Sequence, residues 1–368
     1  MKSMITAAVL LGTLTGSAAS AASITVAPVS TRTPGSPLPL HIGGRVDRTA
    51  DGYRRQWPGT YFEAAFRGSA VSFAVGAGEV ILHVSVDGAP ATRLVRPAPG
   101  LYRVSGMTAG RHVVRVDVAT ESQAGPTVFG GFFAAPGTRA LPPVARTRQI
   151  ELIGDSHTVG YGNTASTRTC SQAEIWQTTD TTQGVAGLLA RRYDADYQVN
   201  AISGRGVVRN YGGMPGDTVP AAYPYTTFDK SRRFADPSWH PRLIVIALGT
   251  NDFTTPLHAG EPWQTRDALH AAYEAEYVAF IRRLRARDPD AHILLWATDM
   301  ADGEIAAEAA RVVARVAAGG DRRIGFVPVR ALALSACDAH PSTRDDARIA
   351  TALADYVKAH PDIWKARR

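Results

Sequence analysis

The chain has 368 residues, of which 45% are apolar and 20% are charged, as in an ordinary globular protein rather than a disordered or fibrous one. This length exceeds that of one typical domain, so two are expected. The net charge of +7 comes from scattered arginines without a dense basic run or a nucleic-acid motif, which argues against a nucleic-acid partner.

The N-terminus has the pattern of a secretory signal peptide. Lys2 precedes an apolar run over residues 5–14, and small residues follow with an A-x-A pattern at Ala19 and Ala21. We expect a signal peptide over residues 1–22 that is cleaved near Ala21 or Ala22, and a secreted or periplasmic chain. The apolar run is shorter than the ~20 residues that span a membrane, and no other segment is longer, so no membrane partner is expected.

Residues 23–135 show the alternation of short β-strands. Apolar residues occur at every second position and are interrupted by Gly, Pro and Asp-Gly turns, which is typical of a sandwich or jelly roll. Examples are Val80, Leu82, Val84 and Val86, and then Val114, Val116 and Val118. The sequence therefore predicts an all-β sandwich (jelly-roll) domain, and the Pro- and Arg-rich residues 136–148 predict a linker.

From residue 149 to residue 368 the period changes, and short apolar strands alternate with helices. This alternation predicts an α/β domain with a parallel sheet and helices on both faces. The helices are indicated by apolar faces at 3.6-residue spacing and by Gly319-Gly320 after the second one. The expected strands are 150–153, 197–202, 243–248, 292–297 and 324–329, and the expected helices are 265–287, 303–318 and 344–359.

Glycines and polar residues follow four of these strands. Ligands of a parallel sheet bind outside the carboxyl ends of its strands, so we expect these residues to meet at one rim. They are Gly154, Asp155 and Ser156 after the first strand, Ser203 to Gly206 after the second, Gly249 to Asp252 after the third, and Cys337 to His340 after the last.

These residue types suit acyl transfer. A serine hydroxyl needs a base to take its proton, and His340 is the candidate base for Ser156. Asp338 would hold the imidazole in the required tautomer. Backbone N–H groups of Ser156 and Gly204 and the side-chain amide of Asn251 would form the oxyanion hole.

The four blocks "GDSH", "SGRG", "GTND" and "DAHPS" resemble those of the SGNH (GDSL-like) hydrolase superfamily. The chain is most similar to carbohydrate esterase family 2, which places a β-sandwich before the SGNH domain and has "GDSxTxGYGN" at the first block. The resemblance implies a flavodoxin-like sheet over residues 149–368. It also implies deacetylation of plant cell-wall polysaccharides such as xylan or mannan, without a cofactor.

The last block departs from the superfamily pattern. Acid and histidine are spaced D-x-H instead of D-x-x-H. Members of carbohydrate esterase family 2 tolerate this spacing, and the resemblance leaves a Ser–His dyad open as the alternative to a triad with Asp338. We expect no direct role for His157, because adjacent side chains rarely face each other.

The chain has two cysteines, Cys170 and Cys337. In an exported chain a pair of cysteines most simply forms a disulfide, and two unpaired buried thiols are the alternative. Neither a CxxC nor an HExxH pattern is present, so no metal site is expected.

Aromatic rings that stack on sugars are a further expectation. Tyr161, beside the first block, and Trp296, near the end of the fourth strand, are the candidates for substrate binding.

We therefore predict a secreted serine carboxylic-ester hydrolase that removes acetyl groups from an acetylated polysaccharide or oligosaccharide, with no obligate protein partner implied. The alternatives are a lipase or thioesterase on the same fold, and a catalytically inert polysaccharide-binding protein.

Overall fold

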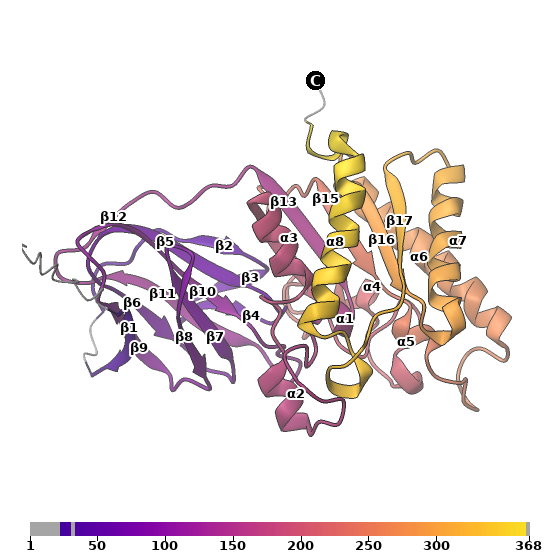
Figure 1. Cartoon of the computed structure of the whole chain (residues 1–368), viewed down its shortest axis with the longest axis horizontal. Helices are drawn as coiled ribbons and strands as arrows, with labels where there is room; N and C mark the ends of the chain where they lie inside the picture. Colours follow the sequence, from indigo (N-terminus) through magenta and orange to yellow (C-terminus); the bar gives the residue numbers. More distant parts are fainter. Residues whose placement is uncertain (1–22, 31–33, 366–368) are drawn as a thin grey trace, which may run out of the picture.

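The computed structural model describes residues 23–30 and 34–365, which form an all-β part and an α/β part (Figure 1). The predicted signal peptide, with its cleavage site, lies outside the described residues. Among the residues that are described, no helix combines the length and the apolarity needed to cross a membrane.

The all-β part is a sandwich of two antiparallel sheets, as predicted. One sheet has the strand order β1-β9-β6-β11-β4-β3, and the other has β12-β5-β10-β7-β8 with β2 paired to β5. Phe62, Phe73, Phe129 and Phe132 fill the core between the sheets. The strands are β1 (Thr25–Val29), β2 (His41–Gly43), β3 (Val46–Thr49), β4 (Gly52–Arg55), β5 (Tyr61–Gly68), β6 (Val71–Val75), β7 (Ile81–Val86), β8 (Ala89–Val95), β9 (Gly100–Ser105), β10 (Gly110–Val118), β11 (Thr127–Ala134) and β12 (Arg139–Ala140).

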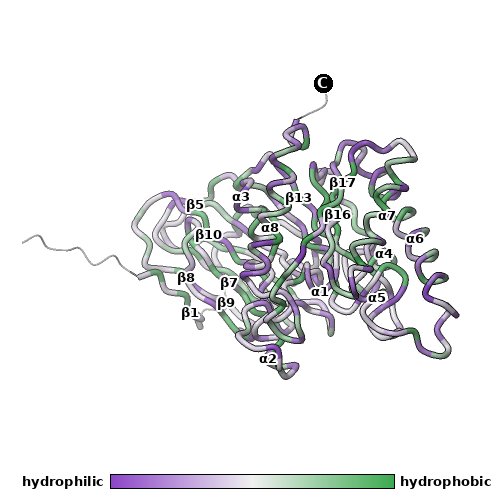
Figure 2. Tube along the Cα trace, turned by 45° about the vertical axis from the view of Figure 1, so that its right-hand side comes forward, coloured by the Kyte–Doolittle hydropathy of each residue, from purple (hydrophilic) through white to green (hydrophobic). Residues whose placement is uncertain are grey.

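The α/β part contains a parallel sheet of order β14-β13-β15-β16-β17, in which all pairings are parallel. Figure 2 shows apolar residues concentrated along this sheet, as expected for strands that are buried on both faces. The strands are β13 (Arg148–Gly154), β14 (Ala195–Ala201), β15 (Leu243–Ala247), β16 (His292–Thr298) and β17 (Ile324–Val329).

Helices cover both faces of this sheet (Figure 1). On one face, α3 and α8 pack against Ile150 and Leu152. On the other face, α6 and α7 pack against Ile153 and Ile244. The helices are α1 (Ser156–Val159), α2 (Gln172–Thr178), α3 (Val185–Tyr193), α4 (Val219–Ala222), α5 (Thr250–Phe253), α6 (Arg266–Arg287), α7 (Glu304–Ala318) and α8 (Thr343–Ala359).

The two parts are joined by buried charges. The Arg45 side chain, which is 1% exposed, extends from the sandwich and donates to Glu151 Oε1 on β13 at 3.1 Å. Its guanidinium lies over the ring of Tyr223, 4.3 Å from the centroid. Arg287 forms a second ion pair with Glu151. Although burial opposes ionisation, Arg287 and Arg45 hold the pKa of Glu151 below its ordinary value.

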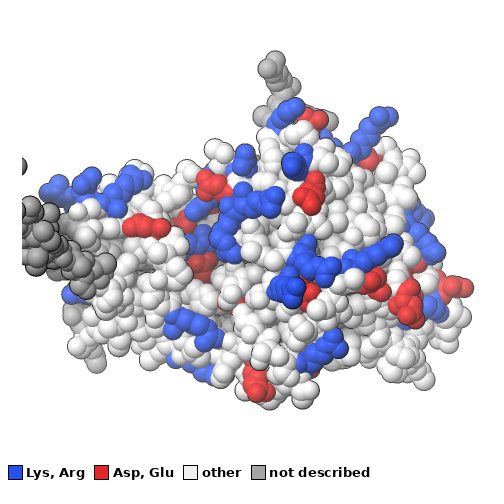
Figure 3. Space-filling view, viewed as in Figure 1, with Lys and Arg blue, Asp and Glu red and all other residues white. Residues whose placement is uncertain are grey.

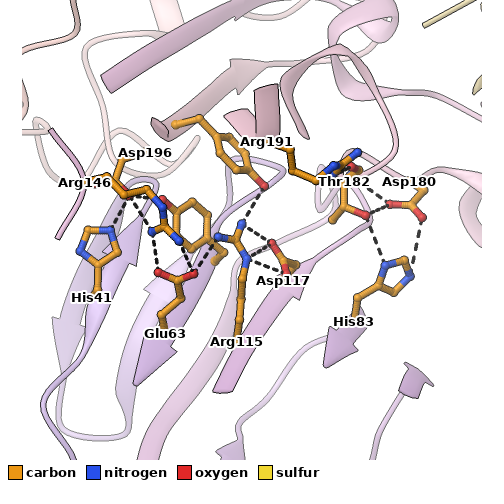
Figure 4. A network of polar contacts seen from close by, with 12 residues as sticks. His41, Glu63, His83, Arg115, Asp117, Arg146, Asp180, Thr182, Arg191 and Asp196 are labelled. Atoms are coloured by element: carbon orange, nitrogen blue, oxygen red, sulfur yellow. Dashed lines mark hydrogen bonds and ion pairs between the residues drawn. The ribbon is translucent and has the colours of Figure 1, made fainter. Parts of the chain in front are cut away.

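A second charged network crosses the boundary between the two parts, which we call the seam (Figure 4). Glu63 on β5 accepts hydrogen bonds from Arg115 at 3.0 Å and from Arg146 at 2.7 Å. Arg146 also pairs with Asp196 on β14 at 3.1 Å. Residues 136–148, which the sequence predicted as a linker, therefore include strand β12 and an arginine that connects the two parts.

A groove of about 1010 Å³ runs along this seam, and its lining includes Arg93, Arg115, Asp117 and Arg191. Acidic and basic side chains line it together, and it contains none of the predicted catalytic residues. In Figure 3, Lys and Arg side chains lie in separate groups with Asp and Glu between them on the viewed face.

Candidate active site

The carboxyl ends of three neighbouring strands form the floor of the site. In the parallel register Gly154 lies opposite Ala201 on β14 and Ala247 on β15. The N–H of Ile202 donates to the Gly154 carbonyl oxygen at 3.2 Å, which continues this alignment beyond the strand end. The segments that follow these strands, with Ser156, Gly204 and Asn251, are therefore brought together, as the sequence predicted.

The turn over residues 154–160, which we call the nucleophile turn after the expected role of Ser156, explains why β13 ends in a glycine. A Cβ on Gly154 would lie 2.0 Å from Thr158 Oγ1 and 2.9 Å from the Ala247 carbonyl oxygen, so a larger residue does not fit. Asp155 caps α1, and its Oδ1 accepts the N–H of His157 at 3.1 Å. The turn closes at Gly160, with φ of +78°, where the N–H returns to the Ser156 carbonyl oxygen. Ser156 thus stands at the start of a tightly constrained turn.

Ser156 and His340 form a hydrogen-bonded pair. The distance from His340 Nε2 to Ser156 Oγ is 2.8 Å. His340 Nδ1 lies 3.0 Å from the Cys337 carbonyl oxygen and 3.1 Å from the Asp338 carbonyl oxygen. Since both carbonyls only accept, Nδ1 carries the hydrogen and Nε2 is left to accept the serine proton. This is the geometry of a serine with its general base.

Asp338 does not take the expected place. Its backbone carbonyl, and not its carboxylate, faces the imidazole. The residue adopts φ of +52°, and its Oδ2 accepts the hydroxyl of Tyr161 at 3.2 Å. The two-residue spacing explains this, because a left-handed residue so close to the histidine presents its main chain to the ring. The arrangement is that of a Ser–His dyad oriented by carbonyls.

The surroundings favour a neutral imidazole. Burial lowers the pKa of His340 below its ordinary value, and the two carbonyls and the Asp338 charge oppose this only in part. The His157 ring lies edge-on to His340 with centroids 5.4 Å apart. Burial, together with the His340 imidazole, lowers the pKa of His157 to about 3, so His157 brings no positive charge near the base.

The expected oxyanion donors lie on the segments that adjoin the turn of Ser156, since Ile202 is bonded to Gly154 and Asn251 to Asp155. Gly204 has φ of +79°, a conformation that favours glycine. Within the described ranges its N–H donates to no protein atom. The Asn251 amide donates to the Arg205 carbonyl at 2.9 Å and to Asp155 Oδ2 at 3.2 Å. An oxyanion would therefore compete with Asp155 for one hydrogen of this amide.

Asp252 holds the loop that carries Gly204. Its carboxylate accepts the N–H groups of Val207, Val208 and Arg209 at 2.9 to 3.0 Å. Burial raises the pKa of Asp252 to about 6 despite these hydrogen bonds. The aspartate of the "GTND" block is thus a support for the neighbouring block.

The two aromatic candidates differ in their positions. The Tyr161 ring lies 4.4 Å from the His340 ring, at the site. Trp296 is only 3% exposed and stacks on His157, so it offers no free face to a sugar. Burial on both faces of the sheet explains this, because the end of β16 is still inside the core.

Sequence reasoning missed two exposed apolar side chains near Gly204. Tyr211 is 51% exposed and Met214 is 50% exposed. The Tyr211 N–H donates to the Gly204 carbonyl oxygen at 2.9 Å. The available signal was an aromatic residue and a methionine around two glycines in the loop after the second block, "NYGGM".

Cys170 and Cys337 form a disulfide across 167 residues, which was the first of the two alternatives. The bonded Cys337 is one of the two residues whose carbonyl oxygens face His340 Nδ1. In the part of the chain that the structure describes, no three His, Cys, Asp or Glu side chains are grouped so as to hold a metal ion.

Known families match both parts of the chain. Residues 42–143 match the family described as carbohydrate esterase 2 N-terminal, and residues 152–362 match the GDSL-like lipase/acylhydrolase family.

Individual relatives agree with these matches. The chain is 40% identical to an acetylxylan esterase/glucomannan deacetylase of Cellvibrio japonicus, over 89% of this chain and 93% of the relative. A solved carbohydrate esterase, described as having divergent catalytic and non-catalytic binding functions at its active site, is 39% identical. It superposes with a TM-score of 0.84 over 90% of this chain and all of its own. A family two carbohydrate esterase from Clostridium thermocellum, solved with cellohexaose, is 28% identical with a TM-score of 0.79, over 89% of this chain and all of its own.

Proposed function

The chain belongs to carbohydrate esterase family 2, and from this premise we propose that it is an exported enzyme that removes O-acetyl groups from plant cell-wall polysaccharides of the xylan or mannan type. Its class is that of the carboxylic-ester hydrolases. The observation that carries the proposal is the 2.8 Å contact between His340 Nε2 and Ser156 Oγ, with Nδ1 held by carbonyl oxygens. The names of the relatives support the polysaccharide and the acetyl group.

The proposed reaction has two halves. In the first, Ser156 Oγ attacks the acetyl carbonyl carbon while His340 Nε2 takes the serine proton. The N–H groups of Ser156 and Gly204 and the amide of Asn251 stabilise the tetrahedral oxyanion. His340 then gives its proton to the sugar oxygen as the C–O bond to the acetyl group breaks. In the second half, water attacks the acetyl-serine with His340 as base, and acetate leaves.

Removal of the nucleophile tests the proposal. Ser156→Ala is expected to stay folded and to release acetate from acetylated xylan or glucomannan several orders of magnitude more slowly, because only the binding and oxyanion contributions remain. The exposed Ser69 on the far sandwich supplies a matched control, and Ser69→Ala is expected to behave like the wild type. Retained acetate release by Ser156→Ala would refute the mechanism.

The acyl group distinguishes the alternatives. An acetyl esterase should prefer aryl acetate to aryl butyrate and octanoate. A lipase or thioesterase on this fold would prefer the longer chains, and an inert binding protein would bind acetylated xylan without hydrolysing any of these esters.

A further inference from the structure

A segment of the sandwich reaches the candidate active site. Residues 119–123 follow β10 and leave the sandwich for the seam. The Ala119 carbonyl oxygen accepts the Thr181 N–H at 3.0 Å and lies 3.1 Å from the Thr181 hydroxyl. The same hydroxyl lies 2.7 Å from the carbonyl oxygen of Val159, in the nucleophile turn. One threonine therefore separates this segment from α1.

Two side chains of the segment hold the backbone of Ser203. Glu121 Oε1 accepts the Ser203 N–H at 2.8 Å. Gln123 Nε2 donates to the Ser203 carbonyl oxygen at 3.1 Å. Both backbone polar groups of Ser203 are thus bound by the sandwich and not by the α/β part that contains them.

The Ser203 carbonyl belongs to the same peptide unit as the Gly204 N–H. A peptide unit is planar and trans, so its carbonyl and N–H point in opposite directions. A donor that holds the carbonyl therefore fixes the direction of the N–H on the other side. It also polarises the unit, which makes the N–H a stronger donor. Gly204 needs this help, because glycine alone leaves its backbone freer than any other residue.

The segment itself is rigidly held. Gln56 Nε2 donates to the carbonyl oxygens of Ser122 and Gln123 at 3.1 and 3.3 Å. Arg55 Nη2 donates to Ser122 Oγ at 3.0 Å. Gln56 and Arg55 are both buried. The backbone of Gln123 is therefore fixed, although the residue is exposed, and this limits the positions from which its amide reaches Ser203, as preorganised electrostatic stabilisation requires.

We propose that Gln123, assisted by Glu121, is a positioning residue that orients the Gly204 N–H as oxyanion donor, so that the sandwich contributes to the catalytic step itself. The inference rests on the proposed function, in which Gly204 is such a donor. It predicts a loss in kcat with little change in KM, since an oxyanion forms only on the way to the transition state.

The test compares Gln123→Met, which keeps the length and removes the donor, with wild type. Loss of a complete oxyanion donor costs about 10²–10³-fold in kcat, and a misaligned donor should cost less, about 10-fold or more. Gln123→Met should lower kcat for an aryl acetate by that factor and leave KM and the melting temperature nearly unchanged. The exposed Gln177 supplies the control, and Gln177→Met should match wild type.

A transition-state mimic separates positioning from a purely structural role. A small alkylboronic acid adds to the serine oxygen and places a boronate oxygen in the oxyanion hole. Its inhibition constant should rise in Gln123→Met by about the same factor as kcat falls. At the second contact, Glu121→Gln keeps an acceptor for the Ser203 N–H and should retain most of the activity, whereas Glu121→Met should lose it. If Gln123→Met does not fold, the nearly isosteric Gln123→Glu takes its place, because its carboxylate also cannot donate.

Wild-type kcat and boronate affinity in a folded Gln123 variant would overturn the inference. A loss of activity that follows the melting temperature and leaves boronate affinity unchanged would overturn it as well. Failure of the proposed function is a different result, since then either the wild type would release no acetate or Ser156→Ala would retain activity. If Ser156→Ala is inactive and Gln123→Met is fully active, the positioning role alone is wrong.

Discussion

At the scale of the single residue, Asp338 decides whether the site is a triad or a dyad. Its carbonyl oxygen holds His340 Nδ1, and this contact does not depend on the side chain. Asp338→Asn should therefore lower kcat by far less than the ~10⁴-fold decrease that follows loss of the carboxylate in a true triad. Asn also keeps an acceptor for the Tyr161 hydroxyl.

The same variant should shift the pH profile. The base must be neutral, so kcat/KM rises as the pH passes upward through the pKa of His340. Burial holds this pKa below the ordinary histidine value, and the Asp338 charge opposes that effect. Removing the charge should lower the pKa further and move the acidic limb of the kcat/KM profile to lower pH. A ~10⁴-fold decrease in kcat/KM at every pH would instead show that the Asp338 carboxylate takes part in catalysis, as in a triad.

Sequence motifs predicted the pair of Ser156 and His340, which the structure brings into contact, but not the groups that hold this pair. Ser156 and His340 meet because each follows a strand end of the parallel sheet, and that follows from topology. The orientation of the Asp338 carboxylate depends on a left-handed backbone that its spacing does not reveal. Trp296 was misjudged because periodicity does not tell where a strand leaves the core. Gln123 lies in the other half of the chain, 80 residues from Ser203, and no motif marks it.

At the scale of the element, continuous apolar runs were the most reliable signal. The predicted strands agree with β13 to β17, and residues 265–287 contain α6 (Arg266–Arg287), because buried strands and amphipathic helices both require those patterns. Strand β12 was hidden because a two-residue edge strand has no periodicity. The strand order of the sandwich could not be predicted either. Alternation shows which face of a sheet a residue occupies, but it does not show which strands are neighbours.

The element that holds His340 is tied down by the disulfide, so redox state should affect catalysis. Cys337 is bonded to Cys170, and its carbonyl oxygen faces His340 Nδ1. A displacement of about 1 Å at a catalytic group can cost ~100-fold in rate. The double variant Cys170→Ser/Cys337→Ser should lower kcat as well as the melting temperature, and loop-closure entropy limits the stability loss to about 4–5 kcal/mol.

Two measurements separate the parts of this prediction. Mass spectrometry without reductant should find the bond, and two free thiols in the exported protein would contradict the disulfide itself. An intact bond whose removal lowers the melting temperature and leaves kcat unchanged would show that it stabilises the fold without positioning the base.

At the scale of the whole molecule, the sandwich and the α/β part are joined by contacts between residues far apart in sequence. Arg45 and Glu151 are 106 positions apart, and Glu63 and Arg146 are 83 apart. The sequence shows how many charged residues there are but not which of them form ion pairs. It therefore predicted two domains but not the contacts between them. We expect this buried junction to make the two parts unfold as one cooperative unit, while Arg55 and Gln56 hold the sandwich segment that contacts Ser203.

Arg45 is the strongest test of that junction. Breaking a buried ion pair by removing one partner costs about 3–5 kcal/mol, and the remaining Arg287 should keep the cost near the lower end here. Arg45→Met is therefore expected to lower the free energy of unfolding by about 3 kcal/mol in urea denaturation. Arg93 is the matched comparison, because it also donates across the seam, to the Gln177 carbonyl oxygen, but this contact is exposed to solvent. Arg93→Met should cost less than about 1 kcal/mol.

Activity adds a second readout of the same variant. Because the sandwich holds the loop that carries Gly204 through Gln123, acetate release by Arg45→Met should disappear at the urea concentration at which the sandwich unfolds. Trp57, one of six tryptophans, is buried between the two parts, and the difference in fluorescence between Arg45→Met with and without Trp57→Phe isolates its signal and reports that transition. If acetate release survived beyond loss of the Trp57 signal, the α/β part would work alone, and the sandwich would be an attached module and not a wall of the active site.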